Sequence, residues 1–142
     1  MKENEIKEFV RRRYAQVASG SSCCLTSTFA PYLRAEEIGY PPQELKEIAA
    51  SAVEMASGCG NPVASADLKR GEVVLDLGSG GGIDVLLAAR RVGPKGKVIG
   101  VDMTPKMIEK AEENVKRVGF PNVEFKLGEI ESLPIEDESI DV

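Results

Sequence analysis

Three cysteines and the absence of histidine limit the chemistry open to this 142-residue chain. Cys23 and Cys24 are adjacent in a polar stretch, and Cys59 lies between two glycines in Gly58-Cys59-Gly60. Without imidazole there is no usual general base at neutral pH, no Ser-His or Cys-His nucleophile pair and no His-ligated metal site. Cytosolic thiols rarely form structural disulfides, so these cysteines are either small buried fillers or chemical groups.

A glycine-rich stretch, Asp76-Leu77-Gly78-Ser79-Gly80-Gly81-Gly82, joins an expected strand to an expected helix. Glycines permit positive φ and let a ligand lie against bare backbone. An open parallel sheet binds its ligands beyond the carboxyl ends of its strands. A dinucleotide fingerprint would need Gly or Ala where this chain has Ile83 or Val85. The spacing therefore favours S-adenosylmethionine, whose cationic α-amino group suits the acid at Asp76.

Two further candidate contacts follow the next two strands. Asp102 ends the second strand, where a carboxylate can accept the hydroxyl protons of a ribose. The segment Gly128-Glu129-Ile130-Glu131 follows the third strand, where an adenine edge would lie. Candidate contacts at the ends of three successive strands indicate a cofactor site more specifically than one glycine loop does. Asp84, in the first turn of a helix, is expected to be stabilised by the helix dipole rather than by a ligand.

The elements that must position these residues follow from hydrophobic periodicity and from Gly and Pro punctuation. Helices are expected over residues 4–18, 43–56, 83–91 and 105–118, and buried strands over 72–77, 97–101 and 123–127. Alternating strands and helices predict parallel βαβ units with right-handed crossovers. We expect an α/β fold with strand order 3-2-1, two N-terminal helices on the cofactor side, and the start of a fourth strand at residues 139–142.

The run from Val73 to Gly82, together with Asp102 and the segment 128–133, resembles the class I methyltransferases, which have a Rossmann-like fold. The resemblance implies that Asp76, Gly78 and Gly80 hold the methionine part of S-adenosylmethionine. It implies that Asp102 holds the ribose and that Glu129 and Ile130 flank the adenine. Further candidate cofactor contacts are Ser79, Gly82 and Met103.

A narrower resemblance, to arsenite methyltransferases, covers nearly the whole chain. It is carried by Ser22-Cys23-Cys24, Gly58-Cys59-Gly60-Asn61-Pro62, the glycine-rich stretch, Val101-Asp102-Met103-Thr104 and Gly128-Glu129-Ile130-Glu131. The resemblance implies that Cys59 and one of Cys23 and Cys24 bind or relay trivalent arsenic, presented as arsenite or an arsenic-thiol conjugate. Arsenic(III) prefers thiolate ligands, as other soft ions do. Its lone pair can attack the S-methyl carbon with no proton to remove.

The family's further arsenic-binding cysteine lies after the fourth strand, beyond Val142. We therefore expect residues 1–70 to be a helical, cysteine-bearing segment and residues 71–142 to be the first half of a cofactor domain, a truncated and inactive fragment by itself. Val73, Val74 and Leu75 would then present an unpaired strand edge, which predicts self-association.

Two alternatives remain open. One is a generic C- or O-methyltransferase of quinone-like or sterol-like acceptors, and the other is a non-catalytic module that binds the nucleoside or a metalloid. A net charge of −5 and 5% aromatic residues disfavour a nucleic-acid partner, and Arg11, Arg12 and Arg13 are expected to form one solvated helix face. No apolar run approaches the ~20 residues of a membrane span, and the charged start lacks a signal-peptide core, so we expect a cytoplasmic protein without a resident metal.

Overall fold

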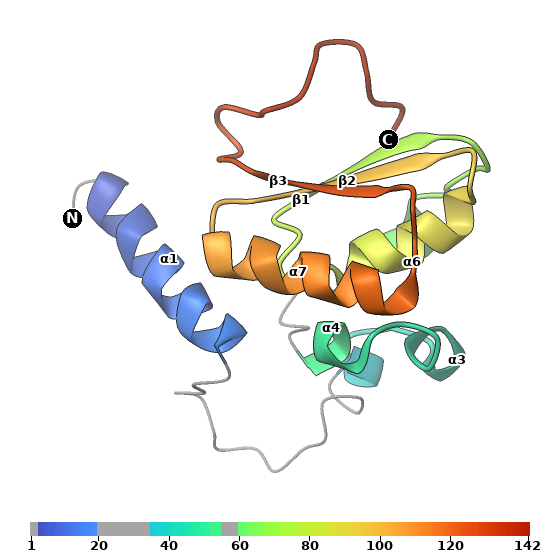
Figure 1. The fold of residues 1–142 in the computed structure, drawn as a ribbon, viewed down its shortest axis with the longest axis horizontal. Coiled ribbons are helices and arrows are strands. Elements are labelled where there is room, and N and C mark those ends of the chain that lie inside the picture. Colours follow the sequence, from blue (N-terminus) through green and yellow to red (C-terminus); the bar gives the residue numbers. More distant parts are fainter. Residues whose placement is uncertain (1–2, 20–34, 55–59) are drawn as a thin grey trace.

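The computed structural model describes residues 3–19, 35–54 and 60–142 (Figure 1). Cys23, Cys24 and Cys59 lie outside these ranges, so the expectations about them remain predictions. No helix in the described ranges is both long and apolar enough to cross a membrane. In chain order the elements are α1 (Glu3–Ala18), α3 (Pro42–Leu45), α4 (Ala50–Glu54), α5 (Pro62–Ser65), β1 (Val73–Leu77), α6 (Ile83–Val92), β2 (Lys97–Asp102), α7 (Pro105–Val118) and β3 (Val123–Leu127).

The three strands form one parallel sheet with β2 between β1 and β3, which confirms the predicted order 3-2-1. Asp76 of β1 pairs in register with Gly100 of β2, and Asp102 pairs with Leu127 of β3. The carboxyl ends of all three strands therefore meet at one edge of the sheet. Helices α6 and α7 cover one face, and α3 and α4 form a further layer beyond them (Figure 1). The predicted α/β fold is confirmed.

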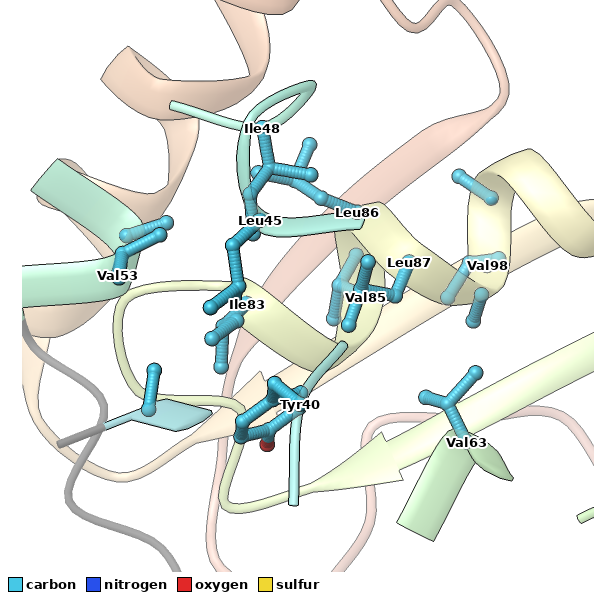
Figure 2. Packing of buried hydrophobic residues seen from close by; sticks show 14 of the residues in the cluster. Tyr40, Leu45, Ile48, Val53, Val63, Ile83, Val85, Leu86, Leu87 and Val98 are labelled. Carbon is cyan, nitrogen blue, oxygen red and sulfur yellow. The ribbon is translucent and has the colours of Figure 1, made fainter. Parts of the chain in front are cut away.

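One hydrophobic core joins the segment before the sheet to the sheet domain. Side chains from residues 35–65 pack with α6, the most buried helix, as Figure 2 shows for Tyr40, Leu45 and Val53 around Ile83 and Leu86. Each fully buried aliphatic side chain stabilises the fold by ~1.5–3 kcal/mol relative to an exposed one. The described residues 35–65 and the sheet domain thus share one core.

The single helix expected over residues 43–56 is wrong, because residues 46–49 separate α3 from α4. Leu45 and Ile48 are both buried on either side of the break. The ion pairs Glu44–Arg91 and Glu47–Arg90 bind this segment to the last turn of α6. The hydrophobic periodicity of the sequence continues across residues 46–49, because the same apolar side chains are buried whether or not the helix is continuous. Two N-terminal helices were expected beside the carboxyl edge of the sheet; of the described N-terminal helices, α1 lines the cavity there and α3 and α4 do not.

Residues at the chain end lie beside β1, on the side away from β2. The Val142 N–H donates to the Val73 carbonyl at 3.2 Å, and the Val142 carbonyl accepts from the Leu75 N–H at 2.8 Å. Two such bonds flanking Val74 are the pattern of a parallel ladder. The Val73 N–H also donates to Oδ2 of Asp141 at 2.8 Å. The expected unpaired edge at residues 73–75 is therefore wrong, since the start of the expected fourth strand satisfies these groups.

Candidate functional site

A cavity of about 640 Å³ lies at the carboxyl edge of the sheet. This volume is within the usual range for small-molecule sites. Seven of the sequence-predicted residues line it: Gly78, Ser79, Gly80, Asp102, Met103, Glu129 and Ile130. Its wall is completed by residues that the sequence reasoning did not select, from α1 (Lys7, Val10 and Tyr14), from the start of α6 (Ile83 and Asp84), and by Tyr40 and Met107. The ends of all three strands thus contribute to one site.

The glycine loop presents bare backbone to this cavity. Gly78 and Gly80 have positive φ values of 78° and 50°, and a Cβ added at either would meet nothing within 4 Å. The N–H groups of Gly78 and Ser79 donate to the Val101 carbonyl at 2.8 and 3.0 Å, which holds the loop against β2. The loop is therefore fixed in place with an open face on which a ligand can lie.

Gly82 is not among the cavity-lining residues. Its φ is 87°, and a Cβ there would be 3.1 Å from Cζ of Phe125. Gly100 of β2 is similar, because its Cβ would lie 2.7 Å from the Phe125 ring and 2.8 Å from Oγ of Ser79. Both glycines let Phe125 pack close to the backbone. Gly100 was missed, although a glycine inside a strand pattern is a known sign of close approach.

Asp102 joins the glycine loop to the start of α7. Its Oδ2 accepts from the Gly80 N–H at 3.0 Å, and its Oδ1 accepts from the Thr104 N–H at 2.8 Å. Thr104 is the N-cap residue of α7 as expected, but its side chain makes no capping bond. A carboxylate has about four acceptor positions, so Asp102 retains acceptor capacity for ligand hydroxyls.

Acidic groups gather at the β1–α6 end of the cavity. Burial, followed by the charges of Asp84 and Asp102, raises the pKa of Asp76 to about 7. Asp76 is half-buried and lies outside the cavity lining, whereas Asp84 is part of it. The Tyr40 hydroxyl donates to Oδ1 of Asp84 at 2.9 Å, and burial raises the pKa of Asp84. The sequence indicated only a favourable helix dipole at Asp84 and did not indicate its hydrogen bond with Tyr40.

The opposite rim is held by ion pairs to α1. Nζ of Lys7 lies 2.7 Å from Oε2 of Glu129 and 3.1 Å from Oε1 of Glu131, and Arg11 also pairs with Glu129. The hydrogen bond from Lys7 is the largest cause of the lowered pKa of Glu129. The expectation that Arg11 is part of a solvated helix face is thus wrong, whereas Arg12 pairs with Glu8 on its own helix. Partly exposed pairs each contribute ~0–1 kcal/mol, so they orient α1 more than they stabilise it.

A buried amide supports the glycine loop from behind. Asn114 of α7 is 0% exposed. Its Nδ2 donates to the Gly81 carbonyl at 2.9 Å, and its Oδ1 accepts from the Ser51 hydroxyl of α4. The only sequence signal for this role was one polar residue on the apolar face of α7.

Known proteins share sequence and fold with this chain. A family model described as a methyltransferase domain matches residues 68–142. An arsenite methyltransferase from Halobacterium salinarum is 48% identical over 97% of this chain and 38% of its own length. A protein-L-isoaspartate O-methyltransferase from Ignicoccus hospitalis is 30% identical over 63% of this chain and 47% of its own length.

The fold is also that of a solved enzyme. The crystal structure of an arsenic(III) S-adenosylmethionine methyltransferase from Chlamydomonas reinhardtii has a TM-score of 0.57 at 37% identity, over 80% of this chain and 38% of that one. The chain therefore spans less than half the length of each of these relatives.

Proposed function

We propose that the cavity of this chain binds S-adenosylmethionine. The chain belongs to the methyltransferase domain family, whose model matches its residues 68–142. The proposal extends to the whole protein, which we infer methylates trivalent arsenic. Cofactor binding is supported above all by one observation: the ends of three parallel strands meet at one cavity, and a bare glycine loop forms part of its wall.

The residues present suit the parts of this cofactor. Gly78 and Gly80 leave room for its methionine part, and the acids at this end suit its two cationic groups, the ammonium and the sulfonium. Asp102 offers free acceptor positions for the ribose hydroxyls beside the end of β2. Ile130 and Met103 supply apolar surface for the adenine near the end of β3. When bound, the cofactor would supply an electrophilic methyl group on sulfur.

Arsenic is favoured as the acceptor by the extent of the sequence match. The alignment with the H. salinarum arsenite methyltransferase covers 97% of this chain, so it includes the cysteine-bearing segment of this chain. The alignment with the I. hospitalis isoaspartate enzyme covers 63%. In this proposal Cys59 and one of Cys23 and Cys24 hold arsenic(III) as thiolates. The arsenic lone pair needs no general base, which fits a chain without histidine.

The described residues next to Cys59 are tied to the cavity wall. Asn61, two residues after Cys59, donates from Nδ2 to the Gly39 carbonyl at 3.0 Å and caps α5 through its Oδ1. Tyr40, the next residue after Gly39, lines the cavity. These contacts support a thiol at position 59 that acts near the methionine end. Thiol chemistry also needs reduced cysteines, so we propose a cytoplasmic location.

Three measurements test the proposal. Calorimetry should detect S-adenosylmethionine binding to this chain, and an absence of binding would refute the cofactor assignment. Arsenite should bind to the chain in a cysteine-dependent way, and the full-length protein should transfer a methyl group to it. Methylation of a quinone-like acceptor without any arsenite binding would support the generic methyltransferase instead. Cofactor and arsenite binding with no methyl transfer by the full-length protein would support the non-catalytic module.

A further inference from the structure

The two ends of the cavity differ in how their acidic side chains are neutralised. At the rim, Glu129 pairs with both Lys7 and Arg11, so its charge is compensated before any ligand binds. At the other end, Asp84 makes no ion pair with any cation in the described part of the chain. Among the described residues, the acid at the rim is therefore paired with cations, whereas the acid next to the glycine loop is not.

Asp84 is held in place rather than free to rotate into solvent. It follows Ile83, which is buried at the start of α6, and its Oδ1 accepts from the hydroxyl of Tyr40 at 2.9 Å. Tyr40 is 3% exposed, and Figure 2 shows its ring packed close to Ile83. The backbone before Tyr40 is fixed in turn by the bond from Asn61 to Gly39. No donor to Oδ2 of Asp84 occurs among the described residues, so this oxygen is available to a ligand.

A second feature at the same end is Ser79, which lines the cavity and is 6% exposed. Its hydroxyl has no hydrogen-bond partner within the described ranges. Buried polar groups are nearly always paired in folded proteins, and no described residue pairs with this hydroxyl. The glycine-loop end thus has both an uncompensated charge and an unsatisfied buried hydroxyl.

We propose that Asp84, positioned by Tyr40, makes this cavity select the sulfonium cofactor over its product, S-adenosylhomocysteine. The inference rests on the proposed function and deepens it. Cofactor and product share the adenine, ribose and amino-acid groups, so contacts with those groups cannot distinguish them. They differ in one methyl group and one positive charge on sulfur. A fixed carboxylate at the methionine end senses that charge, and the product leaves more readily once the charge is gone.

Asp84 suits this role better than Asp76. Asp84 lines the cavity, so its carboxylate can contact a ligand directly. Asp76 is not a lining residue, so it can act on a ligand only by long-range electrostatics. Burial raises the pKa of both carboxyls, so the choice between them rests on their positions. Asp102 also lines the cavity, but two backbone N–H groups already bind it at the end of β2.

The test compares the affinities of the chain for S-adenosylmethionine and S-adenosylhomocysteine by calorimetry at pH 8. The ratio of the two dissociation constants is the readout, because a variant that only loosens the fold weakens both ligands alike. Asp84→Asn keeps the shape and removes the charge, and it should reduce the preference for the sulfonium by roughly threefold to tenfold. Tyr40→Phe keeps the ring and removes the donor, and it should reduce the preference by a smaller factor. Asp137→Asn makes the same chemical change at an exposed residue outside the cavity lining and should leave the ratio unchanged.

The outcomes separate the inference from the function on which it rests. If the parent chain binds neither ligand, the proposed function fails and the inference fails with it. If the parent binds both and Asp84→Asn weakens both by the same factor, Asp84 is a structural residue and the inference alone is overturned. An unchanged ratio in a folded Asp84→Asn variant, judged by its thermal unfolding, overturns it in the same way. A reduced ratio in Asp84→Asn, with Asp137→Asn matching the parent, supports it.

Discussion

Replacing Asn114 by alanine is expected to destabilise the fold strongly. The variant loses the donor to the buried Gly81 carbonyl and the acceptor for the Ser51 hydroxyl. An unsatisfied buried polar group costs ~1–3 kcal/mol, and a typical lost hydrogen bond costs ~0.5–1.5 kcal/mol. Because Ser51 is partly exposed, water can replace its lost partner, so the Gly81 carbonyl dominates the sum.

The expected loss is about 3 kcal/mol once the space left by the amide is included. That is a large part of the ~5–15 kcal/mol by which such domains are stable, and it corresponds to a fall in Tm of roughly 10 °C. The free energy of cofactor binding should change less than the free energy of unfolding. The loop keeps its bonds from Gly78 and Ser79 to Val101 and from Gly80 to Asp102 when Asn114 is removed.

Urea and thermal unfolding followed by circular dichroism measure this change. Ser51→Ala keeps the bond to Gly81 but leaves Oδ1 of the buried Asn114 without its donor, so it should cost ~1–2 kcal/mol, less than Asn114→Ala. Glu112→Gln, at an exposed position on the same helix, should remain within ~0.5 kcal/mol of the parent. If Asn114→Ala unfolds at the same urea concentration as Ser51→Ala, the bond to Gly81 contributes nothing and the reasoning is wrong.

Four further predictions concern the cavity, the thiols and the sheet edge. The pKa of Asp76 is raised from 3.8 to about 7, so the folded chain holds a proton that the unfolded chain has released, and the free energy of unfolding should fall as pH rises through that window. Thermal unfolding between pH 4 and 8 measures this fall, and Asp76→Asn should make it smaller without removing it, since the raised pKa of Asp84 acts in the same direction; an equally pH-dependent variant would contradict the assignment. Asp102→Ala should weaken S-adenosylmethionine binding by ~1–3 kcal/mol in calorimetry, and an unchanged affinity would move the ribose site elsewhere. Cys59→Ser in the full-length protein should abolish methylation of arsenite and leave cofactor affinity as it was, whereas normal turnover would exclude a thiol relay at this position. Light scattering should show a monomer at high concentration, because Asp141 and Val142 already pair with Val73 and Leu75 at the outer edge of β1, and self-association would show that the remaining edge at Leu77 is enough to pair with another chain.

Most elements were predictable because their signals are local. The sheet strands were recognised from short apolar runs, and the ends of α6 and α7 from Gly93 and Gly119, which cap them with positive φ. The positions of Gly78, Gly80 and Asp102 on the cavity wall followed from one rule, that parallel strands bring their carboxyl ends together. A continuous helix over residues 43–56 was wrong because periodicity records which side chains are buried and not whether the backbone between them is regular.

The succession of strands and helices, the glycine loop and the acids that end the first two strands could all be predicted from the sequence, since each depends on residues close together in the chain. Which distant residues complete the site became clear only from the folded chain. Tyr40 reaches Asp84 across 44 residues, and Lys7 reaches Glu129 across 122. Such contacts depend on how helices pack against the sheet, and packing is set by the whole core rather than by any local pattern. The charge difference between the two ends of the cavity arises in this way, from cations on α1 that fold onto the β3 end and leave Asp84 uncompensated.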